Sequence, residues 1–278
     1  MSFLIRFARQ WIAGETLDDA ISRTKKSNNA GIGAIINYLG EHVRDKAETD
    51  SNIEENLGVL KAIEEKKLNA SLSIKLTQLG LDIEEKLCLS SVEKIVTNAA
   101  SKKIFVWIDM ENSPYTEKTI AIYLEIFKRY KNTGIAIQSN LRRSESDVKR
   151  IAAAGGIIRL VKGAYREKSE IAYTSRRDVT INFSSLMGYL FYKSPFFAIA
   201  THDELLINEA LEANKAHNRR LEFQMLMGVR EELKKELVKK GLAVVDYIPY
   251  GKNWFPYSQR RIRERKRNIL LLFRSIFE

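Results

Sequence analysis

Cationic and aromatic side chains gather at the ends of two apolar runs of this sequence. Arg159 lies within the run Gly156–Val161, Lys162 follows it, and Tyr165 comes three residues later. The second run, Ala243–Ile248, contains or precedes Tyr247, Tyr250, Tyr257, Arg260 and Arg261. A scaffold has no need of this combination at the end of a strand, whereas small anionic ligands and planar cofactors bind such groups.

Polar side chains also end most of the other apolar runs. They are Lys75, Asp109, Glu111, Gln138, Thr201, His202 and Gln224. Ion pairs between strand ends, such as Asp109 with Arg159, account for some of them, because an unpaired buried charge is costly. The cations nevertheless outnumber the two carboxylates, and this surplus predicts an anionic ligand.

Adjacent arginines suggest which anion is bound. Arg260 and Arg261 can form paired, charge-assisted hydrogen bonds to a carboxylate. Neighbouring helical residues do not share a face, so both reach one carboxylate only from the first turn of a helix. Pro256 fits a helix start there. Together with the tyrosines, which offer flat apolar walls, the pair predicts a small, partly apolar carboxylic acid.

Short apolar runs alternate with longer segments of helical spacing. The predicted strands are Gly33–Tyr38, Ser71–Leu76, Ile104–Met110, Gly134–Ser139, Gly156–Val161, Phe196–Ala200, Leu221–Leu226 and Ala243–Ile248. Predicted helices include Ile83–Ala100, Glu117–Lys131, Ser144–Ala154, Asp203–His217 and Arg230–Lys240. Eight strand-helix units predict a (β/α)8 barrel, with its site at the carboxyl ends of the strands. A doubly wound open sheet is the alternative, but no G-x-G-x-x-G motif follows the first strand.

One domain is the economical interpretation of the 278 residues. We expect an N-terminal helical extension over residues 1–30, a barrel over 31–278, and a C-terminal helix after the eighth strand. That last segment is basic from Arg260 to Arg267 and then apolar. It could pack on the barrel or touch a membrane surface.

Composition limits the other possibilities. The net charge is +11, yet no nucleic-acid recognition motif is present. The single cysteine, Cys88, predicts a reducing, cytoplasmic location. The three histidines have no ligand-spaced partner in the sequence, so we expect no structural zinc site and no bound metal. The sequence contains no run of about 18 apolar residues, so we expect no membrane-spanning helix. Its N-terminus lacks the pattern of a signal peptide.

These residues belong to ordered motifs that extend from Ile32 to Glu264. The motifs are Tyr38-Leu-Gly-Glu41, Ser73-Ile-Lys75-Leu-Thr-Gln-Leu-Gly80, Ile108-Asp109-Met-Glu111, Ile137-Gln138-Ser-Asn-Leu-Arg-Arg143, Arg159-Leu-Val-Lys-Gly-Ala-Tyr165, Ala200-Thr-His202, Phe223-Gln224-Met-Leu-Met-Gly228, Tyr247-Ile-Pro-Tyr-Gly251 and Arg260-Arg261-Ile-Arg-Glu264. In these motifs the chain resembles the proline dehydrogenase family, flavin-dependent barrel enzymes that oxidise L-proline.

The resemblance implies roles on the substrate side of the site. Lys75, Arg260 and Arg261 would hold the proline carboxylate, and Asp109 would orient the cations or the substrate. The walls around the pyrrolidine ring would be Leu160, Tyr165, Tyr247 and Tyr257. Glu264 would brace an arginine.

The resemblance also implies an FAD site at the strand ends. Its residues would be Met110, Gln138, Arg159, Lys162, Gly163, Ala164, Thr201, His202 and Gln224. Arg159 would lie near the reactive N5 edge, Lys162 against the ribityl-pyrophosphate part and His202 toward the adenosine half. A cation near N5 would stabilise the charge that develops on reduction.

The electron acceptor and two rival functions remain open at the level of sequence. The acceptor would be a membrane quinone, reached through the basic C-terminal helix, or a partner subunit. One rival function is a lyase of barrel fold that forms a Schiff base at Lys75 or Lys162. The other is a basic binding module without catalysis, whose binding would weaken steeply with salt.

Overall fold

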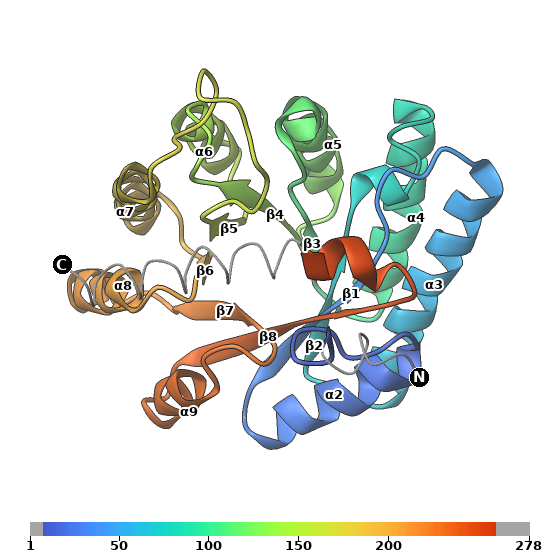
Figure 1. Cartoon of the computed structure of the whole chain (residues 1–278), viewed down its shortest axis with the longest axis horizontal. Helices are drawn as coiled ribbons and strands as arrows, with labels where there is room; N and C mark the ends of the chain where they lie inside the picture. Colours follow the sequence, from blue (N-terminus) through green and yellow to red (C-terminus); the bar gives the residue numbers. More distant parts are fainter. Residues whose placement is uncertain (1–7, 260–278) are drawn as a thin grey trace.

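Eight parallel strands close into a barrel in the computed structural model, which describes residues 8–259 (Figure 1). The strands are β1 (Gly33–Tyr38), β2 (Ala70–Ile74), β3 (Val106–Ile108), β4 (Thr133–Gln138), β5 (Ile158–Val161), β6 (Phe197–Ala200), β7 (Glu222–Leu226) and β8 (Ala243–Tyr250). Each pairs with its neighbour in sequence, and β1 closes the ring by pairing in parallel with β8. The predicted (β/α)8 barrel is thereby confirmed.

Helices surround this barrel and connect consecutive strands. They are α2 (Leu17–Asn29), α3 (Lys46–Glu65), η1 (Leu76–Gln78), α4 (Glu85–Ser101), η2 (Ser113–Tyr115), α5 (Thr116–Arg129), α6 (Ser144–Ala153), α7 (Arg176–Lys193), α8 (Glu204–His217) and α9 (Glu231–Lys239). Side-chain caps fix the first turns of several of them. Asp45 accepts from the backbone of Glu48 at the start of α3, and Ser175 caps α7 in the same way.

Two apolar layers hold the barrel and its helices together. Outward-facing strand residues pack against the helices in one large cluster, which includes Ile74, Ile108 and Leu160. A smaller cluster lies on the inward face and centres on Ile35, Trp107 and Ala198. Side chains alternate between these layers because successive strand residues point to opposite faces.

The seam between β8 and β1 is covered by α2, which precedes the first strand and packs against both. The helical residues that follow β8 instead lie over the barrel opening, where Tyr257 packs with Trp11 and Leu39 (Figure 1). The indole Nε1 of Trp11 donates to Ser258 at 2.9 Å. In a regular barrel of this kind, the helix after β8 would cover the outer face of the β8–β1 seam. Here α2 covers it instead. The proposed division at residue 30 stays a prediction.

One boundary prediction at the end of the barrel is wrong. Residues 254–259 are already helical, so a helix begins by Trp254 and not at Arg260. Pro256 falls in its first turn, where its missing N–H is tolerated. Arg260, Arg261, Glu264 and the basic-apolar tail lie outside the described residues, as does the start of the N-terminal segment. No helix among residues 8–259 is long and apolar enough to cross a membrane.

A buried ion pair fastens two outer helices to β8. Lys234 of α9 and Asp246 of β8 are 0% and 1% exposed, and Nζ of Lys234 lies 2.5 Å from Oδ1 of Asp246. The other carboxylate oxygen accepts from Ser27 of α2 at 2.7 Å and from Arg23 at 3.3 Å. Asp246 thus joins α2 and α9 to the same strand.

We expect Asp246→Ala to lower the free energy of unfolding by about 3–5 kcal/mol, because Lys234 then loses its buried anion and keeps only the exposed Glu231, 2.9 Å away. Urea unfolding, followed by circular dichroism and tryptophan fluorescence, measures the change. Glu232→Ala is the control, since it removes only an exposed pair with Lys235 and should move the midpoint little. Equal midpoints for both variants would contradict the role of Asp246.

Candidate active site

Asp109 lies at the centre of a polar network inside the barrel mouth. It follows β3 and is 6% exposed. Its Oδ1 accepts from Ser73 at 2.6 Å and pairs with the Arg159 guanidinium. Its Oδ2 accepts from the Tyr247 hydroxyl at 2.6 Å and lies 3.5 Å from Nζ of Lys75. The predicted pairing of Asp109 with Arg159 is confirmed.

Lys75 extends this network toward the loop after β1. It directly follows β2 and is 7% exposed. Its Nζ lies 3.4 Å from Oε1 of Glu41, and the same oxygen accepts from the Tyr165 hydroxyl at 3.2 Å. One chain of charges therefore links Arg159, Asp109, Lys75 and Glu41.

The network keeps Lys75 and Asp109 ionised despite their burial. Burial alone would lower the pKa of Lys75, but Tyr165 and Asp109 raise it well above the ordinary value. Burial alone would raise the pKa of Asp109, yet Arg159 and Lys75 hold it below the usual range. Burial, followed by the charge of Asp109, raises the pKa of Tyr247 well above its ordinary value, so this hydroxyl keeps its proton and donates it.

Arg159 presents a free edge in this environment. Its guanidinium lies against the rings of Trp107 and Tyr247, 5.2 and 5.6 Å from their centroids. Within residues 8–259, its Nη1 is buried and has no hydrogen-bond partner. The same holds for Oε1 of Gln224, whose Nε2 donates to Glu222 at 2.7 Å. Buried polar atoms are rarely left unpaired, so these two atoms point to a ligand.

The loop after β5 packs closely against the loop after β4. Gly163 has φ +105°, and a Cβ there would lie 2.2 Å from Oδ1 of Asn140. Among the described residues, that buried Oδ1 also lacks a hydrogen-bond partner. Lys162, next to Gly163, is anchored by Asp203 at 2.6 Å and by Thr180 at 3.0 Å. The absence of a side chain at Gly163 therefore keeps Asn140 in place at the strand ends.

Other predicted binding residues have structural contacts at the same end of the barrel. Nε2 of His202 accepts from the backbone N–H of Leu226 at 2.9 Å, which fixes its ring at the end of β7. Gln138 donates to the backbone carbonyl of Glu111 at 2.8 Å. Thr201 is 5% exposed and accepts from the backbone of Asp203.

Comparison with known proteins gives the family of this chain. A family model described as proline dehydrogenase matches residues 20–269. The chain belongs to the proline dehydrogenase family. It is 36% identical over 274 residues to proline dehydrogenase 1 of Bacillus subtilis (strain 168), covering 98% of this chain and 91% of that protein. It is 29% identical over 279 residues to the proline dehydrogenase of Deinococcus radiodurans, covering 98% of this chain and 90% of that one.

The fold of this family member agrees with a solved structure. Proline utilization A (PutA) from Bdellovibrio bacteriovorus, inactivated by N-propargylglycine, superposes with a TM-score of 0.87 at 24% sequence identity. The match covers 93% of this chain and 32% of PutA, so the present chain spans about a third of that protein. This likeness supports the barrel alone.

Three predicted contacts lie apart from the network. Leu160 is fully buried in the outer apolar cluster, because it alternates with the inward-facing Arg159, and the structure does not bring it to the barrel interior. Met110 belongs to the same outer cluster. Ala164 is exposed in the loop after β5. Tyr257, by contrast, is buried over the barrel mouth, close enough for its charge to affect Tyr247.

Several residues of the network had no role assigned from sequence. Glu41 lies three residues beyond the end of β1, so extending the strand-end search into the loops would have found it. Ser73 and Trp107 lie on the inward faces of β2 and β3, where period-two alternation from Asp109 would place them. Glu222 begins β7, and burial raises the pKa of its carboxyl. Nothing in its local sequence distinguishes it from a surface acid.

We expect the stability advantage of the wild-type protein over Asp109→Asn to shrink as the pH falls below about 4. Cations hold the pKa of folded Asp109 below its ordinary value of 3.8, so the unfolded chain takes up this proton first. The contribution is therefore complete above the unfolded pKa and is lost as the pH falls through the folded one. Urea midpoints of both proteins from about pH 7 to about pH 3 measure the gap. A gap that stays constant over this range would refute the shift.

Proposed function

We propose that this family member oxidises L-proline to Δ1-pyrroline-5-carboxylate with FAD as its cofactor. The observation that carries the proposal is the buried network of Lys75, Asp109 and Arg159, which offers a free guanidinium edge inside the barrel mouth. The relatives named proline dehydrogenase match nearly the whole chain, which supports L-proline as the substrate.

The residues present fit a flavin. Nη1 of Arg159 is an unsatisfied donor and Oε1 of Gln224 an unsatisfied acceptor within the described part of the chain, and a flavin ring carries both kinds of partner. A side chain at Gly163 would displace Asn140, whose buried Oδ1 is a further unsatisfied acceptor among the described residues. When bound, the flavin supplies the acceptor for the hydride that leaves C5 of proline. The residues proposed to hold it are Gln138, Arg159, Lys162, Gly163, Thr201, His202 and Gln224.

The substrate side follows from the charges. Lys75 remains protonated and is suited to hold the proline carboxylate, with Arg260 and Arg261 as its proposed companions. Tyr165 and Tyr247 are already fixed by Glu41 and Asp109, so their rings can bound the pyrrolidine without reorganising. Asp109 acts by positioning Lys75, Arg159 and Tyr247. The amine of proline must be unprotonated, because its lone pair forms the C=N bond as hydride leaves.

The Schiff-base alternative is disfavoured by the same charges. A lysine forms an imine only as the neutral amine, and enzymes that use one lower its pKa. Asp109 and Glu41 act in the opposite direction on Lys75, whose pKa is raised. Lys162 is likewise paired with a carboxylate, that of Asp203. The binding-module alternative does not explain why so many charges are buried inside the barrel.

The electron acceptor is proposed to be a quinone at the membrane or a partner subunit. The basic segment from Arg260 onward, followed by an apolar stretch, suits a peripheral contact with an anionic surface. We accordingly propose that the protein is cytoplasmic and associates peripherally with the membrane.

The proposal predicts a yellow protein whose flavin absorbance bleaches when L-proline is added without oxygen. Proline gives up a hydride and the cofactor accepts it, so the oxidised-flavin band disappears. Absorbance spectra before and after addition measure this, with D-proline as the stereochemical control. A bound flavin that L-proline leaves oxidised would disprove the substrate. A protein that takes up no flavin on reconstitution would disprove the cofactor.

We expect Gly163→Ala to lower flavin occupancy at least about tenfold, because its Cβ would displace Asn140 and the backbone has φ +105. Two controls separate the causes. Gly155→Ala has a comparable positive φ of +72 but nothing within 4 Å, and Gly188→Ala in α7 has open space. The ratio of flavin to protein absorbance reports occupancy. An equal loss of flavin in Gly155→Ala and Gly163→Ala would indicate a general effect of backbone strain. It would contradict a flavin-binding role for the Gly163–Asn140 contact.

A further inference from the structure

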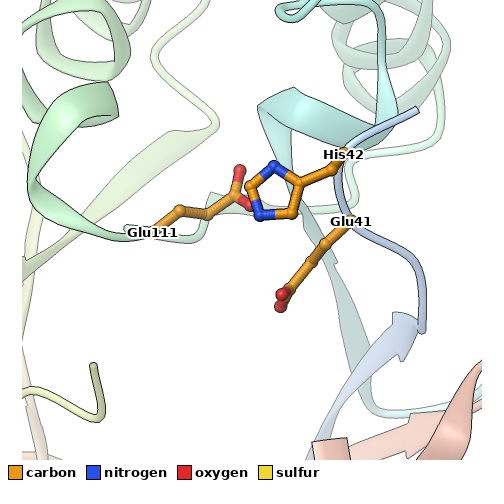
Figure 2. A group of neighbouring side chains, drawn as sticks. All are labelled: Glu41, His42 and Glu111. Carbon is orange, nitrogen blue, oxygen red and sulfur yellow. The ribbon is translucent and has the colours of Figure 1, made fainter. Parts of the chain in front are cut away.

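Beside the proposed substrate pocket, the fold brings together a group of potential metal ligands that are distant in sequence. Glu41 and His42 lie in the loop after β1, and Glu111 lies after β3 (Figure 2). One ligand atom from each lies within 4.8 Å of the others. Figure 2 shows the imidazole of His42 beside the Glu111 carboxylate, with the Glu41 carboxylate below them.

The tautomer of His42 follows from its neighbours. Its Nδ1 lies 3.1 Å from Oδ2 of Asp82. The Tyr115 hydroxyl donates to the other oxygen of Asp82 at 2.6 Å. A carboxylate only accepts hydrogen bonds, so Nδ1 of His42 carries the hydrogen that faces Asp82. The lone pair of Nε2 is left for a metal, in the carboxylate-histidine-metal arrangement common in proteins.

Glu111 is a fixed ligand opposite this ring. It is 1% exposed, and its two oxygens accept from the backbone N–H and hydroxyl of Thr77 at 3.1 and 2.6 Å. Carboxylate oxygens have further lone pairs, and metal-binding carboxylates are commonly held by such hydrogen bonds.

We propose that Glu41, His42 and Glu111 form a binding site for a divalent transition-metal ion, with Zn²⁺ as the ion that suits one imidazole and two carboxylates. Tetrahedral zinc needs ligand atoms about 3.3–3.5 Å apart, so the group must close by about 1–1.5 Å. Glu41 can supply this movement by rotating its side chain in the loop after β1, since its contacts with Lys75 and Tyr165 are both made to flexible side chains. His42 is 46% exposed at its side chain, which gives the ion access.

Metal binding here would act on the proposed pocket through Glu41. That carboxylate currently lies 3.4 Å from Nζ of Lys75 and accepts from Tyr165. A bound ion would draw Glu41 away from both, so Lys75 and Tyr165 would each lose one of the contacts that position them. The existence of the site is independent of the proline reaction, while its effect on turnover rests on the proposed function.

Direct binding is the first test. Tag-free protein, stripped with a chelator, is dialysed against micromolar Zn²⁺ and analysed for bound metal, and Co²⁺ absorbance reports the ligand set. We expect one equivalent in the wild type, none in His42→Ala, and about 10–100-fold weaker binding in Asp82→Asn, which removes only the support of the imidazole. His217→Ala is the matched control, because it removes a histidine that stacks on Phe191 elsewhere.

The outcomes separate the site from the reaction. Failure of the wild type to bind Zn²⁺, or equal binding by His42→Ala, overturns the site. If the site binds Zn²⁺, the KM for proline should rise with Zn²⁺ in the wild type and stay constant in His42→Ala; a constant KM in both overturns the coupling through Glu41. Stoichiometric Zn²⁺ binding in a protein that never oxidises proline supports the site and refutes only the proposed function.

Discussion

The structure depends on one buried carboxylate that needs partners from several strands. Asp109 cannot stay ionised at 6% exposure without Lys75, Arg159, Ser73 and Tyr247. These side chains come from β2, β5 and β8 and the position after β2, which meet only when the barrel closes. Closure of the fold and assembly of the charged site are therefore the same event.

Stability alone does not explain such a network. Buried ions lose their hydration, and apolar residues of the same volume would stabilise the barrel as well or better. What the network provides is a set of fixed cations in a region of low dielectric, where each charge acts strongly on a ligand. Asp246 and Lys234 use the same kind of pair on the outside of the barrel, where it joins helices instead. The two ion pairs therefore differ in role. The inward-facing pair presents charge to the barrel interior, and the outward-facing pair joins helices to a strand.

Sequence reasoning recovers the barrel and its inward-facing charges, since both follow from local alternation and strand-end position. Arg159 next to Leu160 shows the limit: adjacent residues in one motif point to opposite faces, and only Arg159 faces the interior. The sequence predicted no functional role for Glu41 or His42, because they lie in a loop whose path depends on tertiary contacts. The placement of α2 over the seam of the barrel was likewise hidden, because its partners on β8 lie more than two hundred residues away in sequence.

Glu41 is close to more partners than one carboxylate can bind at once. It neutralises Lys75, accepts from Tyr165 and lies within ligand distance of His42 and Glu111. Lys75 keeps Asp109 when Glu41 turns away, so its charge remains partly compensated, whereas Tyr165 loses the hydrogen bond that its hydroxyl donates to Glu41. Movement of Glu41 therefore acts on Tyr165 before it disturbs the central network. We expect a binding event at the loop after β1 to change the wall of the proposed pocket while the charges around Asp109 stay in place.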